Sequence, residues 1–273
     1  MEDIYQFLGT STLGMFGAGH LGRAIACGLL DAGFPSHKLT ICHRGSADTH
    51  RQLVESGLSE CIIDCKEVIC RSKIVLYVVR PQDYRSLADY TIPPDCLLVS
   101  FLAGVELGRM PLSLAESQRV RVMPSAPDTL RRKNGIAAIY PSDNVVAQAI
   151  LSALKLRIFP LKNEADIHAF TALGPCLPIA LTYWEGLGCK VDENELLDTA
   201  ARFDLPEYSQ VVQWARTVQP RNLSTEERDR YIAQATTPGG VTEAILGEIR
   251  VGRRLSVALV RGIHRSRELA ALL

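Results

Sequence analysis

Short apolar runs alternate with segments of helical periodicity up to about residue 160 of the chain. The run Lys73–Val79 is continuously apolar after its first residue, which is typical of a central parallel strand covered on both faces. Further strands are expected over residues 13–16, 38–43, 95–101, 119–123 and 135–140, and helices over 21–32 and 142–154, the latter with Ser142 as its N-cap. This alternation predicts βαβ units and a doubly wound parallel sheet.

The pattern changes after Arg157–Leu161, because helical periodicity dominates from Glu164 to the end. Over Ile245–Leu273, apolar residues recur at helical spacing, with arginines on the opposite face. The chain is therefore expected to contain an N-terminal α/β domain, residues 1–162, and an all-α domain, residues 163–273.

The turn after the first expected strand carries three glycines in the sequence G-A-G-H-L-G. Gly17 would allow the tight turn, Gly19 would let backbone approach a pyrophosphate, and Gly22 would let the next helix pack closely on the strand. The amides that open this helix, at His20 and Leu21, would hold the anion with the help of the helix dipole. This order predicts a Rossmann dinucleotide site, and the alternative is an ordinary strand-to-helix turn.

The residues that end the second expected strand distinguish NADP from NAD. An NAD site usually places Asp or Glu there, about 20 residues past the glycines, to bind the ribose 2′-hydroxyl. This chain instead reads C-H-R-G-S over Cys42–Ser46, in which Arg44 can pair with a 2′-phosphate and Ser46 can donate to it. The prediction is NADPH in preference to NADH, and the alternative is a solvated arginine in a loop.

Two later loops follow expected strands, where a cofactor should lie. One contains Val79, Arg80 and Pro81, and the other contains Ala103 and Gly104. Small or conformationally restricted residues there would let backbone approach a ribose or nicotinamide. Taken alone, each loop is more often a plain turn.

Composition narrows the class of protein. The 273 residues are 47% hydrophobic and carry a formal net charge of zero, so there is no general attraction to nucleic acid or an anionic membrane. The eight cysteines include no CxxC pair, and the spacing of Cys61, Cys65 and Cys70 matches no zinc pattern. Free buried thiols and no metal are expected. The acidic N-terminus and the absence of a long apolar run predict a soluble, cytoplasmic protein.

A series of motifs runs through both expected domains. In order they are G-A-G-H-L-G, V-V-R-P-Q (78–82), S-F-L-A-G (100–104), V-M-P-S-A-P (122–127), G-P-C-L-P (174–178), T-P-G-G-V-T (237–242) and R-S-R-E-L (265–269). The series resembles pyrroline-5-carboxylate reductases over nearly the full length. The T-P-G-G-V-T motif is the most specific, because it is not a general Rossmann feature.

The resemblance implies a Rossmann domain that binds NAD(P)H and a helical domain that forms a homodimer by interleaving with that of a partner. The imine substrate would lie between the two domains, and the family reduces pyrroline-5-carboxylate to proline. Hydride transfer to a protonated imine needs mainly proximity and orientation.

The resemblance also implies roles for single residues. Thr242 would face the imine nitrogen. The alternative role is to cap the helix over 243–249, and both roles can hold together. Backbone at Gly239 and Gly240 would close over the substrate carboxylate. The substrate loop would contribute Thr171, Leu173, Gly174 and Pro175, and Ser125 would lie near the cofactor ribose.

The substrate half departs from the family pattern. The family's loop Ser-Gly-Ser-Gly-Pro-Ala is Thr-Ala-Leu-Gly-Pro-Cys here, over residues 171–176. In the family's Met-Pro-Asn motif, the asparagine is replaced by Ser125 in this chain. Residues 186–227 also lack the family's alanine-rich helical sequence. A site built around hydrogen bonds discriminates strongly between substrates when one hydrogen-bonding partner is removed. We therefore expect a divergent, NADPH-dependent imine reductase that acts on something other than, or besides, pyrroline-5-carboxylate.

Two other interpretations stay open. A hydroxyacid dehydrogenase usually has a catalytic lysine on the first long helix of its second domain, but Glu164–Trp184 contains none and offers only His168 as a proton donor. A catalytically inactive NADP-binding dimer, acting as a scaffold or sensor, would fit the altered substrate loop.

Overall fold

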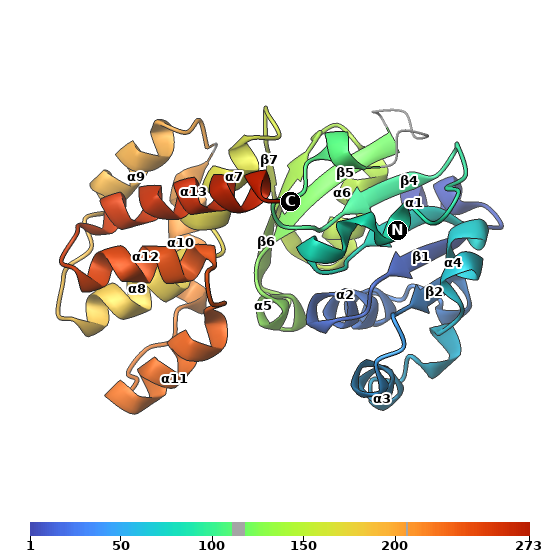
Figure 1. The fold of residues 1–273 in the computed structure, drawn as a ribbon, viewed down its shortest axis with the longest axis horizontal. Coiled ribbons are helices and arrows are strands. Elements are labelled where there is room, and N and C mark those ends of the chain that lie inside the picture. Colours follow the sequence, from blue (N-terminus) through green and yellow to red (C-terminus); the bar gives the residue numbers. More distant parts are fainter. Residues whose placement is uncertain (111–117, 206) are drawn as a thin grey trace. The chain divides into compact units, whose positions relative to one another are not determined.

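The computed structural model describes residues 1–110, 118–205 and 207–273. The chain divides into two units, Met1–Pro160 and Leu161–Leu273 (Figure 1). The first unit is built on a sheet and the second is helical, so the fold class predicted from the alternating pattern is confirmed.

The sheet of the first unit has the strand order β2-β1-β3-β4-β5-β6-β7. Each expected strand is present, and one more follows them. The bounds are β1 Thr12–Phe16, β2 Leu39–Cys42, β3 Ser72–Tyr77, β4 Leu97–Ser100, β5 Arg119–Pro124, β6 Gly135–Tyr140 and β7 Leu156–Pro160.

The sheet is mostly parallel, as expected, with one antiparallel pair of neighbouring strands. The pairs from β2 to β5 are parallel, but β6 runs antiparallel to β5, and β7 runs parallel to β6. The link from β5 to β6 holds only the short helix α5, Pro127–Arg131. A parallel crossover needs a dozen or more residues, so this link instead lets the chain turn back along the sheet.

Both helices expected in this unit are present, over residues 20–31 and 145–153, whereas the helices over 2–8, 47–55, 65–71 and 127–131 were not predicted. The helix expected from Ser142 is α6, Val145–Ala153, and its N-cap is Asn144, whose side chain accepts from Ala147 N at 2.9 Å. Helix α1, Glu2–Leu8, was not expected, although its buried residues Ile4 and Leu8 have helical spacing. The remaining helices are α2 His20–Asp31, α3 Ala47–Glu55 and α4 Cys65–Arg71, with short 3₁₀ turns at Ser36–Lys38 (η1), Ser59–Cys61 (η2), Pro81–Leu87 (η3) and Leu107–Arg109 (η4).

Helices cover both faces of the sheet. Successive strand residues point to opposite faces, so Leu13 and Met15 enter one core while Gly14 faces the other. A Cβ at Gly14 would lie 2.8 Å from Val68 of α4, so α4 packs directly on β1. The opposite face carries helices that contact one another, namely α1 with α6 and α2 with both α5 and α6.

The strand order places a crevice where a dinucleotide would bind. From β1 the chain passes to β2 on one side and then returns to β3 on the other side of β1. Open α/β sheets bind ligands at such a reversal, outside the carboxyl ends of the strands. The glycine turn after β1 and the Val79–Arg80 loop after β3 both lie at this edge.

The second unit contains α7 Asp166–Leu173, α8 Leu177–Gly186, α9 Glu193–Ala201, α10 Tyr208–Val218, α11 Thr225–Ala235, α12 Val241–Arg250 and α13 Leu255–Ala271. Helices α12 and α13 lie side by side, and α13 also packs on α7 (Figure 1). Gly252, at a φ of 80°, separates α12 from α13 within the periodic segment 245–273. Among the described residues, no helix has both the length and the apolar character needed to cross a membrane.

Candidate functional site

The glycine turn has the geometry that its sequence predicts. Gly17 has a φ of 106°, and a Cβ there would lie 2.6 Å from the Val78 carbonyl oxygen, so both conformation and space require glycine. A Cβ at Gly22 would lie 2.5 Å from the Gly17 carbonyl oxygen, which explains the close packing of α2 on β1.

Gly19 differs from the other two glycines of the motif in the space around it. A Cβ at this position would meet no protein atom within 4 Å. Gly19 is the N-cap of α2, and the hydrogen bonds of the helix begin with Arg23 N donating to Gly19 O at 2.9 Å. The preceding amides, at His20, Leu21 and Gly22, therefore have no acceptor within the helix and can hold an anion at its positive end.

A cavity of about 460 Å³ opens beside this turn. It brings together six of the residues proposed for the cofactor: Gly17, Gly19, Arg44, Ser46, Val79 and Arg80. They come from the ends of β1, β2 and β3, which are far apart in sequence. The residues fit a dinucleotide, because the turn is open at Gly19 and α2 directs its amides there.

Arg44 has a carboxylate partner that sequence reasoning did not identify. Its Nη1 lies 2.6 Å from Asp83 Oδ1, and its side chain is 65% exposed. A 2′-phosphate at Arg44 would therefore share the guanidinium with Asp83. Ser46 caps α3 by accepting from Thr49 N at 3.4 Å, and its hydroxyl hydrogen is still available to an anion.

Part of the lining of the same cavity consists of His43 and Cys42, with Cys65 beside them. Burial, and then the neighbouring His50, lower the pKa of His43, whose Nδ1 accepts from Gly45 N at 3.1 Å. Burial and a thiol–thiol contact with Cys65 raise the pKa of Cys42. The lowered pKa of His43 and the raised pKa of Cys42 both favour the uncharged form, which suits the uncharged part of a nucleotide.

The other cofactor candidates are absent from the lining of this cavity. Pro81 opens η3, and Ala103 and Gly104 follow β4, with Gly104 at a φ of 75°. Ser125 is buried, and its hydroxyl accepts from Ile136 N at 3.0 Å and lies 2.7 Å from Thr129 Oγ1. This hydroxyl therefore ties β5 to β6 within the unit.

Sequence reasoning missed several residues that line the cavity, among them Asp83, Cys65 and Tyr90. Asp83 lies only three residues after Arg80, so its charge was a usable signal. Cys65 is the first residue of α4, and Tyr90 follows η3. No local sequence pattern marks either residue as part of a cofactor site.

The helical unit brings Thr242 to the altered substrate loop. The Thr242 hydroxyl donates to Cys176 Sγ at 3.4 Å. Thr242 lies inside the first turn of α12, whose N-cap is Gly240, so the alternative that Thr242 caps this helix is wrong. Burial raises the pKa of the Cys176 thiol to about 11, so this thiol stays neutral at physiological pH.

The amides of the proline-glycine-glycine turn already donate hydrogen bonds within the protein. Gly239 N donates to Glu243 Oε2 at 2.6 Å, and Gly240 N donates to the Thr237 carbonyl at 2.9 Å. Arg265 Nε holds the Gly239 carbonyl at 2.8 Å. In this structure, the donors left for a substrate carboxylate are the first amides of α12, because the hydrogen bonds of that helix begin at Ala244 N.

The substrate loop is held mainly by internal contacts. Thr171 Oγ1 donates to the Ile167 carbonyl at 2.7 Å, and Leu173 is fully buried. Buried Tyr208 donates its hydroxyl to the Leu173 carbonyl at 2.9 Å. A Cβ at Gly174 would lie 2.8 Å from the Phe170 carbonyl oxygen, so the glycine before Pro175 is required by close packing.

A family model described as "NADP oxidoreductase coenzyme F420-dependent" matches residues 12–104. This match spans β1 to β4 and includes the glycine turn and Arg44. Fold, cavity and match together define a Rossmann-type, NAD(P)-dependent oxidoreductase.

Full-length comparisons narrow this class. A pyrroline-5-carboxylate reductase of Pisum sativum is 27% identical over 95% of this chain and 96% of its own. A solved pyrroline-5-carboxylate reductase of Coxiella burnetii has a TM-score of 0.58 at 20% identity and covers 95% of this chain and 98% of that one. The Plasmodium falciparum enzyme with NADP bound has a TM-score of 0.56 at 17% identity, covering 95% and 98%. Over nearly its full length the chain is similar to pyrroline-5-carboxylate reductases, and the resemblance carried by the motifs is confirmed.

Proposed function

We propose that this protein is an NADPH-dependent reductase of a cyclic imine, with a substrate other than, or besides, pyrroline-5-carboxylate. The observation that carries the proposal is the glycine-turn cavity of the first unit. Within the helical unit, the hydroxyl of Thr242 in the first turn of α12 supplies a group for the imine nitrogen. The full-length similarity to pyrroline-5-carboxylate reductases supports the reaction class.

The proposed roles of the residues follow from their positions. The first amides of α2 hold the pyrophosphate, while Arg44 and Ser46 hold the 2′-phosphate. Bound NADPH supplies a hydride for the C=N carbon, and the imine nitrogen ends with one more proton. Thr242 orients that nitrogen or passes it the proton, and the first amides of α12 hold a substrate carboxylate.

The changed loop supports an altered substrate. Leu173 and Cys176 replace a hydroxyl-bearing residue and an alanine of the family pattern, and Cys176 takes the hydrogen bond of Thr242. A neutral thiol beside the proposed proton donor offers no charge to a polar substrate. The proposal is that this side of the site favours a more apolar imine than the family substrate.

Arg44 is proposed to decide the preference for NADPH. Arg44→Gln should lower NADPH affinity about tenfold and leave NADH affinity unchanged, because only NADPH carries the 2′-phosphate. The effect is modest since the side chain is 65% exposed and shared with Asp83. Asp83→Asn should raise NADPH affinity by freeing the guanidinium. Fluorescence titration measures both.

Arg51→Gln is the matched control, because Arg51 is also exposed and ion-paired but lies on α3 outside the cavity lining. Equal losses of NADPH and NADH affinity in Arg44→Gln would contradict the proposed contact with the 2′-phosphate.

A screen of NADPH oxidation tests the reaction itself. The full chain is incubated with NADPH and cyclic imines of five-, six- and seven-membered rings, including pyrroline-5-carboxylate, with NADH in parallel. We expect turnover of at least one imine, and faster turnover of another imine than of pyrroline-5-carboxylate. Proline formation as the fastest reaction would refute the altered substrate. NADPH binding without oxidation by any imine would instead identify an inactive NADP-binding scaffold, and oxidation by keto acids alone a hydroxyacid dehydrogenase.

A further inference from the structure

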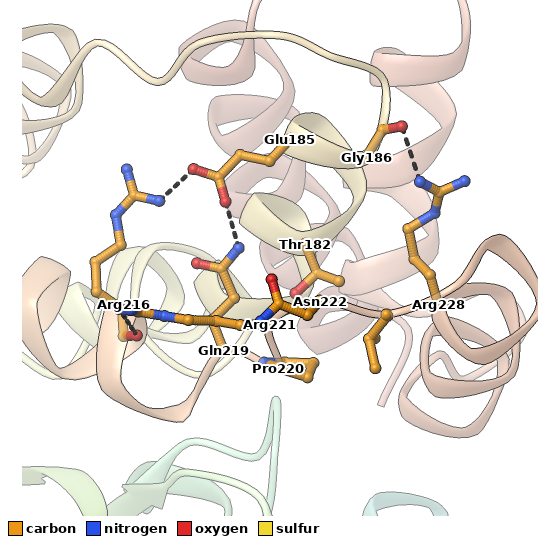
Figure 2. Close-up of a pocket in the computed structure, with 10 residues that line it drawn as sticks. Thr182, Glu185, Gly186, Arg216, Gln219, Pro220, Arg221, Asn222 and Arg228 are labelled. Atoms are coloured by element: carbon orange, nitrogen blue, oxygen red, sulfur yellow. Dashed lines mark hydrogen bonds and ion pairs between the residues drawn. The ribbon is translucent and has the colours of Figure 1, made fainter.

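The helical unit contains a cavity of about 620 Å³ that the proposed reaction does not use. Its walls come from the end of α8, the end of α10, the segment that joins α10 to α11, and the start of α11 (Figure 2). Most of its lining residues fall within 186–227, where the sequence departs from the family pattern. This volume lies within the range of small-molecule sites, roughly 300–1,000 Å³.

The charges that line the cavity are unequal. Three arginines, Arg216, Arg221 and Arg228, face a single carboxylate, Glu185. That carboxylate is already used, because it pairs with Arg216 and accepts from Gln219 Nε2 at 2.5 Å (Figure 2). The lining therefore keeps two positive charges that Glu185 does not neutralise.

Arg228 is held in the wall with a donor to spare. Its side chain is 20% exposed, and Nη1 donates to the Gly186 carbonyl at 2.8 Å (Figure 2). Its Nε is buried and has no hydrogen-bond partner among the described residues, and it forms a long ion pair, at 3.9 Å, with the Asp229 carboxylate, which does not line the cavity. A Cβ at Gly186 would lie 2.3 Å from Arg228 Nη1, so glycine there makes room for the guanidinium.

Arg221 is the second available cation. Among the residues that the structure describes, its guanidinium makes one hydrogen bond, from Nη2 to the Arg216 carbonyl at 3.4 Å. Within the described part of the chain, no carboxylate lies within ion-pair distance of it. An arginine fork binds the paired oxygens of a phosphate or carboxylate. A buried N–H without an acceptor, such as that of Arg228 Nε, costs about 1–3 kcal/mol.

We propose that this cavity binds a small, multiply charged oxyanion, with its acidic groups on Arg221 and Arg228 and its polar body beside Asn222 and Gln219. Both cations and both amides line the same cavity, and the only carboxylate in its lining is turned to Arg216 and Gln219. The site is independent of the proposed imine reduction, because it shares no residue with the glycine turn or with Thr242.

Calorimetric titration of the full chain with pyrophosphate and with citrate tests the site. NADPH is kept saturating so that the glycine turn is occupied, and chloride keeps the ionic strength constant. We expect saturable binding of at least one anion, with affinity about tenfold lower in Arg221→Gln and in Arg228→Gln. Tighter binding of pyrophosphate would identify a phosphorylated ligand, and tighter binding of citrate a polycarboxylate.

Arg230→Gln is the control. Arg230 is an exposed arginine of α11, the helix that carries Arg228, but it does not line the cavity. It should bind both anions as the unaltered protein does. Arg221 is exposed, so its substitution should leave folding intact, and circular dichroism checks this for each variant. Absence of saturable binding, or equal binding in Arg221→Gln and the unaltered protein, would overturn the proposal. The proposal would also be overturned if neither anion binds and Arg221→Gln changes the oligomeric state. A second copy of the chain would then fill the cavity.

Discussion

Gly19→Val is expected to lower NADPH affinity at least about 100-fold, equivalent to about 2.7 kcal/mol, without lowering the melting temperature of the free protein. The protein has room for the added side chain, because a Cβ at Gly19 would meet nothing within 4 Å. The same space is where a pyrophosphate would approach the first amides of α2. The side chain would therefore exclude the ligand and leave the fold unchanged.

Gly17→Ala is the informative comparison for this prediction. At Gly17 an alanine would need a φ of 106° and would bring its Cβ to 2.6 Å from the Val78 carbonyl oxygen. This variant should lose both NADPH binding and stability. Thermal melting with and without NADPH separates the two effects. If Gly19→Val binds NADPH normally, the pyrophosphate does not lie against the glycine turn.

Thr242→Ala is expected to lower kcat/KM about 100-fold for the best imine of the screen while NADPH affinity stays unchanged. In the free protein the hydroxyl donates only to a neutral thiol at 3.4 Å, which is a weak hydrogen bond. The hydroxyl can therefore exchange that partner for the imine nitrogen. Steady-state kinetics and NADPH titration give the two quantities.

Thr242→Ser keeps the hydroxyl and should retain most of the activity. Cys176→Ala removes the partner thiol but not the hydroxyl, so it should change KM more than kcat. If Thr242→Ala turns over the imine as fast as the unaltered protein, then Thr242 only packs α12 and the proposed role is wrong.

The strands and the glycine turn were predictable because their signals are local. The apolar run Lys73–Val79 and the spacing of Gly17, Gly19 and Gly22 depend on neighbours within a few residues. The cap of α6 was not predictable in this way. Ser142 and Asn144 are both good N-cap residues, and only the actual helix start at Val145 chooses between them.

The direction of β6 also escaped the sequence pattern. Its apolar run, residues 135–140, looks the same in either direction, because a strand buried on both faces has no periodicity that depends on orientation. What decides is the short connection through α5, which is too short for a parallel crossover.

By itself, the sequence determined that this protein has a Rossmann unit, a helical unit and a similarity to pyrroline-5-carboxylate reductases. Those features follow from hydrophobic periodicity and from motifs in which all residues lie close together in the chain. Only the tertiary structure decided that Asp83 shares Arg44, that Cys176 takes the hydroxyl of Thr242, and that Arg221 and Arg228 face one cavity. The first two pairs are separated by 39 and 66 residues, and packing rather than local pattern sets which side chains meet over such distances.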